Sequence, residues 1–232
     1  LIAGARLIIA SHAAVVDGKQ LIHLLQQHEI TLLQATPAGW QMLLASGWEG
    51  KRDLKALAGG EALSGSLAEA LLPRTASLWN LYGPTETTIW SAAHELVEPV
   101  PFVGRPIANT SVWILDARGE LCLLGVPGEI CIGGWGVTTG YLNQPELTDA
   151  RFIDDSFTDP AMQAAGSGGG KLYRTGDRGR WRPDGNLEHL GRLDHQVKVR
   201  GHRIELGEIE AALARHPCVN SAVALVADHR LM

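Results

Sequence analysis

Short apolar runs alternate with segments of helical spacing over residues 17–82, and this alternation restricts the fold more than any other feature. The helical segments are 18–25, 37–44 and 67–72, and the apolar runs are 30–35, 54–59 and 77–82. Asp17, Pro37 and either Ser64 or Ser66 can begin the three helices, and Pro73 is expected to end the third. Strands that alternate with helices predict an α/β fold, in which helices cover the faces of a parallel sheet.

From about residue 100 the sequence predicts a compact β unit, because Gly and Pro are frequent between short segments of alternating polarity. Residues 112–115 and 120–124 predict a hairpin around the turn at 116–119. Other expected elements are strands at 128–133 and on both sides of the turn at 183–186, a short helix at 147–152 and a flexible loop at 165–170.

The last part of the chain differs again. Residues 194–203 are polar and basic, and a helical pattern at 206–215 and an apolar run at 219–226 follow them. We expect this tail to begin a small α+β domain without completing it. The predicted domains are therefore residues 1–193 and residues 194–232, in a chain that we expect to be a piece of a longer protein.

Composition excludes several classes of protein. Lys and Arg number 20 against 25 Asp and Glu, and the net charge of −5 argues against binding of nucleic acid or a membrane surface by charge. The three cysteines have no spacing that predicts a disulfide framework or a zinc site, which favours a reducing cytoplasm. No apolar run approaches the length of about 18 residues that a membrane span needs.

The most informative segment is 80–88, where a predicted strand ends in a Gly-Pro turn. Ligands of open α/β sheets bind at the carboxyl ends of the strands, and this turn delivers Thr85 and Glu86 there. A hydroxyl beside a carboxylate suits a phosphate oxygen and a hard cation such as Mg²⁺. Tyr82 can stack on a base and Asn80 can contact its edge. The alternative is an ordinary turn with solvated side chains.

Two further segments suggest a nucleotide. Asp177 follows a glycine in 173–177, and it is either a turn residue or a carboxylate for the two hydroxyls of a ribose. The segment 191–210 carries four basic residues that can meet phosphate, or it is a solvated charged face. These residues are Arg192, Lys198, Arg200 and Arg203.

Other nucleotide and hydrolase motifs are absent from the sequence. It contains no G-x-x-x-x-G-K-[ST], no G-x-S-x-G and no H-E-x-x-H, so a P-loop NTPase, a hydrolase with a nucleophile elbow and a zinc protease are unsupported. The glycines of 134–140 miss the dinucleotide-binding G-x-G-x-x-G by one position.

Taken together, the motifs resemble the adenylation domains of nonribosomal peptide synthetases, which are members of the adenylate-forming superfamily. Supporting strings are GGEAL at 59–63, GRP at 104–106, GEICIGG at 128–134, GYL at 140–142 and LTDARF at 147–152. The resemblance covers essentially the whole chain, and LGEIE at 206–210 favours the peptide-synthetase branch. It implies the adenylate-forming fold, with part of the large N-terminal domain and the start of the small C-terminal domain.

The resemblance also implies a reaction. An amino acid and ATP give aminoacyl-AMP and pyrophosphate, and the acyl group then moves to the phosphopantetheine thiol of a carrier protein. The implied cofactors are ATP and Mg²⁺, and the implied partners are the peptidyl carrier and condensation domains of the parent chain. The family's pyrophosphate loop, its aspartate for the substrate amine and its terminal lysine would lie outside residues 1–232, so we expect these residues alone to be inactive. An acyl- or aryl-CoA ligase and a catalytically silent adenosine-binding fragment are the alternatives.

Four sets of residues match positions with known roles in that family. The nucleotide set is Gly60, Glu61, Ala62, Asn80, Tyr82, Gly83, Thr85, Asp177 and Arg192. The resemblance implies a catalytic set of Thr85, Glu86 and Arg192, in which Glu86 would hold Mg²⁺. The substrate pocket set is Ala38, Gly39, Leu57, Gly59, Leu81, Ile89 and Trp90. The resemblance places Asp194, Lys198 and Gly201 in the family's hinge and thiolation loop.

The pocket set carries no charge, so we expect a small or neutral amino acid such as glycine, alanine or cysteine. Trp90 is bulky and is expected to shorten the pocket. For Leu57 and Ile89 the alternative is plain core packing.

Overall fold

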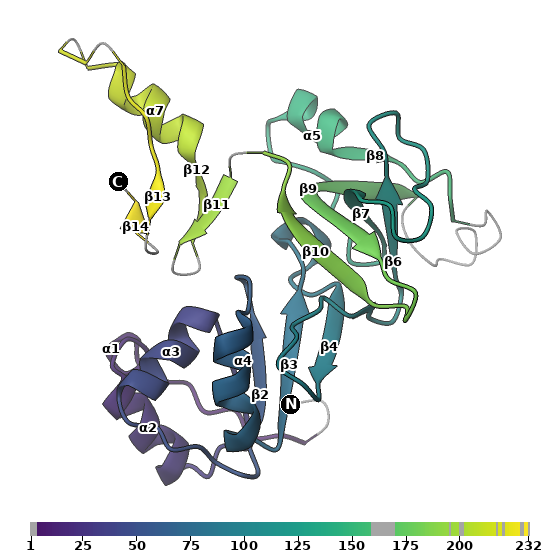
Figure 1. Ribbon diagram of the computed structural model, residues 1–232. Coiled ribbons are helices and arrows are strands. Elements are labelled where there is room, and N and C mark those ends of the chain that lie inside the picture. Colours follow the sequence, from purple (N-terminus) through teal and green to yellow (C-terminus); the bar gives the residue numbers. More distant parts are fainter. Residues whose placement is uncertain are drawn as a thin grey trace. The chain divides into compact units, whose positions relative to one another are not determined.

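A computed structural model describes residues 4–158, 170–194, 196–199, 202–216, 218–219, 221–227 and 230–231 (Figure 1). The chain divides into two compact units. The first contains Leu1–Asn80 and Glu95–Pro101, and the second contains Leu81–His94 and Phe102–Met232. The boundary predicted between residues 193 and 194 stays a prediction.

The first unit is the predicted helix and strand alternation, drawn from purple to blue in Figure 1. Its elements are α1 (His12–Val15), α2 (Gly18–Gln27), β1 (Leu32–Ala35), α3 (Pro37–Ala45), β2 (Lys55–Gly59), α4 (Gly65–Leu71), the 3₁₀ turn η1 (Leu72–Arg74) and β3 (Ser77–Tyr82), whose last two residues belong to the second unit. β1 and β2 pair in parallel, with Leu32 opposite Lys55, and β3 follows β2 in the sheet.

Side-chain caps explain where the three longer helices begin. Asp17, Thr36 and Ser64 each accept a hydrogen bond from a backbone amide in the first turn of α2, α3 and α4. The core of the unit lies between these helices and the strands, where Trp40 and Leu78 are fully buried. The Trp40 indole also donates to the carbonyl of Leu57 at 3.1 Å.

Two details of this unit differ from the prediction. An apolar run such as 30–35 predicts a buried strand, but Leu32 on β1, the first strand of its sheet, is 56% exposed. Pro73 does not end α4 directly. The helix ends at Leu71, and Pro73 lies inside η1, whose tighter turns accept a proline near their start.

The second unit contains an antiparallel sheet with the strand order β10-β9-β7-β6, and β8 also pairs with β9. Its elements are the 3₁₀ turn η2 (Thr85–Thr87), β4 (Ala92–Leu96), whose last two residues belong to the first unit, β5 (Arg105–Pro106), β6 (Thr110–Leu115), β7 (Gly128–Gly134), α5 (Pro145–Arg151), β8 (Phe152–Asp154), β9 (Lys171–Trp181) and β10 (Leu187–Arg192). Ile114, Ile130 and Leu187 pack in the larger core of this unit. The predicted turn at 183–186 joins β9 to β10.

The predicted hairpin at 112–124 is wrong in its second strand. The turn forms, since Asp116 accepts from the amides of Arg118 and Glu120. The returning residues make only one bridge, between Leu115 and Leu121. β6 instead pairs along its whole length with β7, in which residues 129–133 are all buried.

The tail contains β11 (Gln196–Val199), β12 (His202–Glu205), α7 (Leu206–Ala214), β13 (Val226–Ala227) and β14 (Arg230–Leu231). The predicted helix at 206–215 is confirmed, but the predicted strand at 219–226 is wrong, because residues 221–225 are not in a strand. The apolar Val223 and Leu225 are exposed there, so the run does not mark a buried strand. Pro217 and most of the expected loop at 165–170 lie outside the described residues.

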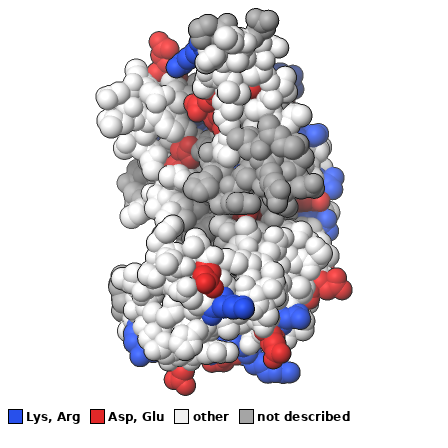
Figure 2. Space-filling model, turned by 90° about the vertical axis from the view of Figure 1, so that its left-hand side faces the viewer, with Lys and Arg blue, Asp and Glu red and all other residues white. Residues whose placement is uncertain are grey.

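Charged side chains of both signs are interspersed on the face shown in Figure 2, which agrees with the small net charge. Within the part of the chain that the structure describes, no helix combines the length and the apolar character needed to cross a membrane.

Candidate functional site

The turn after β3 closes tightly on itself. The amide of Ser91 donates to the carbonyl of Tyr82 at 2.8 Å, and the hydroxyls of Thr87 and Ser91 lie 2.6 Å apart. A Cβ atom on Gly83 would collide with the backbone of Ile89 and Ser91, so only glycine fits this close approach. The predicted Gly-Pro turn therefore has a steric reason for its glycine.

The end of this turn carries backbone strain. Thr88 and Ile89 have φ angles of +59° and +75°, and such angles are outliers for β-branched residues. Strain of this kind concentrates at functional sites. The side chain of Ile89 is 58% exposed, so core packing is the wrong explanation for it. Leu57 is half-buried, and its role stays open.

Glu86 lies in η2 and is only 7% exposed. Its Oε1 accepts a hydrogen bond of 2.6 Å from the hydroxyl of Tyr141, and its backbone carbonyl accepts from the amide of Thr138 at 2.9 Å. Burial, and then the hydrogen bond to Glu86, raise the pKa of Tyr141, which therefore stays protonated and donates. Thr85 is exposed beside it.

Tyr141 was not among the predicted site residues. It lies between β7 and α5, 55 positions from Glu86, in the string GYL that supported the family resemblance. That string was the only signal in the sequence, because spacing alone gives no chemical reason to pair a tyrosine with Glu86.

Asp177 on β9 is the centre of a second cluster. The hydroxyl of Tyr82 donates to its Oδ2 at 2.6 Å, and Arg192 Nη1 donates to its Oδ1 at 3.0 Å. His189 Nε2 lies 3.3 Å from the same Oδ1, and sequence reasoning missed this residue. The structure thus brings together Tyr82, Asp177 and Arg192, which are three members of the nucleotide set.

The charge state of Asp177 follows from these contacts. Burial alone would raise the pKa of this carboxyl, which is 7% exposed, but the hydrogen bond and charge of His189, the hydroxyl of Tyr82 and the charge of Arg192 outweigh it. The pKa is therefore below its ordinary value, and Asp177 is an anion at neutral pH. Burial, followed by Asp177, raises the pKa of Tyr82.

Arg192 also holds the predicted hinge residue. Its Nε and Nη2 donate to the two carboxylate oxygens of Asp194 at 2.7 and 2.6 Å. The amide of Gln196 donates to Asp194 at 3.2 Å, and Arg151 lies 3.6 Å away. Burial would raise the pKa of Asp194, but the hydrogen bond and charge of Arg192 lower it overall. One guanidinium therefore bridges Asp177 and Asp194.

The backbone before Asp177 is fixed by Glu129 on β7. The Glu129 carboxylate accepts from Arg174 at 2.6 Å and from the amide of Gly176 at 3.0 Å. Thr175 donates to the carbonyl of Ile130 at 2.7 Å and accepts from the amide of Asp177 at 2.9 Å. These bonds explain how the segment Thr175-Gly176-Asp177, whose composition is typical of a turn, has a fixed backbone conformation inside β9.

The remaining members of the predicted sets lie as follows. The carboxyl end of β2 and the residues after it contain Leu57, Gly59, Gly60, Glu61 and Ala62. The first turn of α3 contains Ala38 and Gly39, and β3 contains Asn80 and Leu81. Asn80 is buried. Trp90 is half-buried in the turn after β3 and Lys198 is exposed on β11, whereas Gly201 lies outside the described residues.

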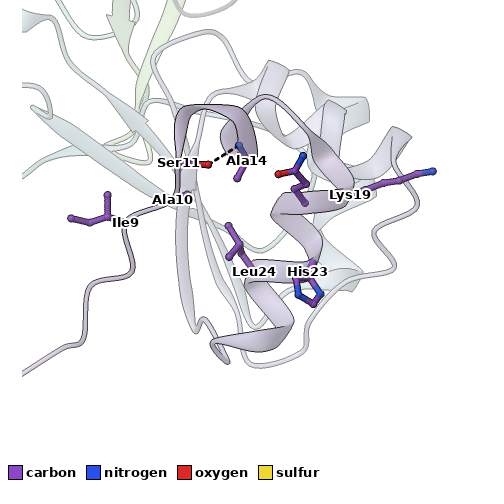
Figure 3. A pocket seen from close by; sticks show the side chains of 8 residues that line it. Ile9, Ala10, Ser11, Ala14, Lys19, His23 and Leu24 are labelled. Atoms are coloured by element: carbon purple, nitrogen blue, oxygen red, sulfur yellow. Dashed lines mark hydrogen bonds between the residues drawn. The ribbon is translucent and has the colours of Figure 1, made fainter.

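A separate pocket of about 440 Å³ lies beside α1 and α2 (Figure 3). Figure 3 shows the Ser11 hydroxyl bonded to the amide of Ala14, with Leu24 and His23 on the neighbouring helix. None of the predicted site residues lines it, and it contains no buried charged group.

The donor set fits a magnesium ion of the kind that nucleotides carry. Among the described residues, no three His, Cys, Asp or Glu side chains gather to hold a metal by themselves. Mg²⁺ typically binds one or two carboxylates together with substrate phosphates. A single buried carboxylate such as that of Glu86 matches this pattern.

The lowered pKa values predict an acid sensitivity of the Asp177 cluster. A carboxyl whose folded pKa lies below its unfolded value of about 3.9 stabilises the fold above that pH, and it loses this contribution as the pH falls through the folded pKa. Hydrogen exchange of peptides from β9 and β10 should therefore lose protection as the pH falls from 6 to 3. The loss should be smaller in Asp177→Asn, and equal losses in both proteins would contradict the assignment.

Comparison with known proteins identifies the family of this chain. The family model of "AMP-binding enzyme" matches residues 1–142, and the chain belongs to this family. It is 44% identical over 231 residues to a dimodular nonribosomal peptide synthase of Bacillus subtilis, and 40% identical over 232 residues to tyrocidine synthase 3 of Brevibacillus parabrevis. These alignments cover 98% and 97% of the chain but only 9% and 3% of the relatives.

Solved structures give the same result. A four-domain nonribosomal peptide synthetase bound to AMP and glycine matches 96% of the chain and 17% of that protein, with 47% identity and a TM-score of 0.72. A synthetase protein containing adenylation and PCP domains, bound to a vinylsulfonamide inhibitor, matches 91% of the chain and 37% of that protein, with 30% identity and a TM-score of 0.79. The predicted family and the adenylate-forming fold are confirmed.

Proposed function

We propose that this chain is part of the amino-acid-activating domain of a nonribosomal peptide synthetase, which converts an amino acid and ATP into aminoacyl-AMP and pyrophosphate. The observation that carries the proposal is the buried Asp177 anion with Tyr82 and Arg192 around it. A carboxylate of this kind accepts the hydroxyls of a ribose in other nucleotide sites. The similar synthetase with bound AMP and glycine supports the same function.

The proposed chemistry needs no general base, because the amino-acid carboxylate is already a nucleophile at neutral pH. The protein then contributes positioning and stabilisation of charge on the α-phosphate. Glu86 would hold Mg²⁺ together with phosphate oxygens, and the ion would supply positive charge to the phosphates. Thr85, exposed beside Glu86, would contact a phosphate, and Arg192 would contact the ribose or a phosphate.

Binding of a ribose at Asp177 requires one present contact to give way. A carboxylate offers about four lone-pair positions. Tyr82, Arg192 and His189 already occupy three of them, whereas a ribose diol needs two. The bond from the charged Arg192 is the stronger kind, so the neutral Tyr82 hydroxyl is the contact that we expect to be displaced. This would leave its ring to pack on adenine.

We further propose that the amino acid is small or uncharged, because the pocket set offers no charged partner for its side chain. Trp90 would limit the depth of the pocket. The exposed, strained Ile89 supports a role in contacting substrate.

Pyrophosphate exchange by the whole polypeptide that contains this chain tests the function. Exchange that depends on one small neutral amino acid is expected. Exchange driven by fatty or aryl acids would favour an acyl- or aryl-CoA ligase, and ATP binding without any exchange would indicate a silent adenosine-binding fragment.

The proposed partners follow from the same function. The aminoacyl group would pass to the phosphopantetheine thiol of a peptidyl carrier domain, and a condensation domain would use it. Cys122, Cys131 and Cys218 are free thiols, which supports the reducing cytoplasm that we propose as the location.

Thiol loading gives a test of Asp194 as the hinge. Proline fixes φ near −65° and restricts the preceding residue, here Leu193. Asp194→Pro should leave pyrophosphate exchange largely intact and slow loading of the carrier thiol by at least about tenfold, or roughly 1.4 kcal/mol on the barrier. Radiolabelled amino acid bound to the carrier measures loading.

The control for this experiment is Asp194→Ala, because proline also removes the carboxylate that Arg192 holds. The alanine variant should load faster than the proline variant. Equal loading by both would mean that the lost carboxylate, and not the fixed torsion, causes the defect. Equal loss of exchange and loading in Asp194→Pro would indicate misfolding.

A further inference from the structure

The Tyr141–Glu86 contact is not used by the proposed chemistry, and it joins a buried carboxylate to a residue far along the chain. We propose that Tyr141 is a positioning residue, whose hydroxyl fixes the Glu86 carboxylate in the orientation that binds the divalent cation of the nucleotide. This inference rests on the proposed function, in which Glu86 is a ligand of that cation.

The segment before Tyr141 is attached to the turn that carries Glu86. The Thr88 hydroxyl donates to the carbonyl of Gly136 at 2.7 Å, and the amide of Thr138 donates to the carbonyl of Glu86 at 2.9 Å. A Cβ atom on Gly136 would collide with the carbonyl of Thr87, so the two backbones lie close together at this glycine. Two hydrogen bonds and a close backbone contact therefore hold residues 136–138 against η2 and the residue after it.

The backbone and the ring of Tyr141 are each held by a further contact. Its amide donates to the Thr148 hydroxyl at 2.9 Å, and that hydroxyl donates to the carbonyl of Gln144 at 2.8 Å, at the start of α5. The ring packs edge-on against Phe152, with 5.5 Å between ring centroids. The phenol thus points at Glu86 from a fixed base, which is what a supporting residue needs in order to orient a ligand.

A phenol suits this role better than a basic side chain. A glutamate has several rotatable bonds, and fixing one of its oxygens removes much of that freedom before the cation binds. The Tyr141 hydroxyl donates to Oε1 without carrying a positive charge, so it orients the carboxylate without cancelling the charge that attracts the metal ion. Residues that orient metal ligands in this way typically affect metal affinity about 10- to 100-fold.

Tyr141→Phe in the whole polypeptide tests the inference, because phenylalanine keeps the ring that packs on Phe152 and removes only the hydroxyl. Mn²⁺ replaces Mg²⁺ as a probe, and electron paramagnetic resonance measures its binding in the presence of saturating ATP. The Mn²⁺ dissociation constant should rise about tenfold. The concentration of Mg²⁺ needed for half-maximal pyrophosphate exchange should rise by the same factor, while ATP binding in EDTA should not change.

Tyr173→Phe is the matched control. Its hydroxyl lies 3.4 Å from that of Tyr141, and its substitution removes a phenol hydroxyl while keeping the hydrogen bond from Tyr141 to Glu86. The Mn²⁺ dissociation constant of this variant should stay within about twofold of the wild-type value. Equal weakening by both variants would overturn the specific role of Tyr141.

A double-mutant cycle separates positioning from general loss of packing. In a Glu86→Gln background the hydroxyl of Tyr141 has no charged ligand to orient, so Tyr141→Phe should no longer weaken Mn²⁺ binding. A tenfold loss that persists in that background, or unchanged Mn²⁺ affinity in Tyr141→Phe alone, would overturn the inference. Failure of the proposed function has a different signature, namely a wild-type protein that binds Mn²⁺ and ATP but catalyses no amino-acid-dependent exchange.

Discussion

Glu86→Gln in the whole polypeptide should slow the formation of aminoacyl-AMP by about 10²- to 10³-fold, the usual cost of losing a group that stabilises charge in the transition state. Glutamine keeps the size of the side chain and an oxygen that can accept from Tyr141, so the substitution removes the charge and little else. Single-turnover formation of aminoacyl-AMP at saturating ATP and Mg²⁺ measures the effect.

Glu120→Gln provides the control for the loss of one negative charge. Glu120 is exposed on the turn after β6, and its backbone, not its side chain, makes the hydrogen bonds of that turn. This variant should form aminoacyl-AMP at the wild-type rate. If Glu86→Gln also kept that rate, Glu86 would have no part in the chemistry, and the role of Tyr141 would lose its basis.

Asp177→Ala should weaken ATP binding by about 1.5–3 kcal/mol, the usual value of hydrogen bonds to a charged group, which corresponds to roughly 10- to 150-fold. The fold should persist, because Arg192 keeps its two bonds to Asp194. Calorimetric titration with ATP measures the dissociation constant, and circular dichroism reports the fold. An unchanged affinity would show that the ribose does not bind at Asp177.

Tyr82→Phe tests whether the Tyr82 hydroxyl leaves Asp177 when ATP binds. If the Tyr82 hydroxyl must leave Asp177 when a ribose binds, its removal should leave ATP affinity unchanged or raise it slightly, since the ring remains. Weakening of ATP binding by both variants to the same extent would instead mean that the hydroxyl stays in place and contributes to the bound state.

Local patterns predicted the elements of the first unit well. Asp17 and Ser64 are helix caps whose function depends only on the next few residues, so the starts of α2 and α4 could be predicted from the sequence. The strand at 77–82 and the turn after it could be predicted for the same reason, because a Gly-Pro pair marks its end.

Contacts between distant residues could not be predicted in this way. The hairpin at 112–124 has a correct turn, but β6 pairs with β7 and not with the residues that directly follow the turn. The apolar run at 219–226 has the composition of a strand, yet most of it has no strand partner among the described residues. Pairing is decided by the whole sheet and not by one segment.

In the candidate site too, single residues could be predicted from the sequence, but the contacts between distant residues could not. The family resemblance named Tyr82, Asp177 and Arg192 one by one, but their hydrogen bonds span up to 95 positions and become visible only in the fold. His189 and Tyr141 contact named site residues and carry no local motif chemistry of their own. Side chains that support a site are therefore the part that sequence reasoning missed.

The bridge made by Arg192 has a consequence for protein engineering. A splice between two synthetases placed at the predicted domain boundary, between residues 193 and 194, would take Arg192 from one parent and its carboxylate partner from the other. If the second parent has no acidic residue at position 194, Arg192 loses its two bonds to that carboxylate and keeps its bond to Asp177. Such chimaeras should keep positions 192 and 194 from the same parent.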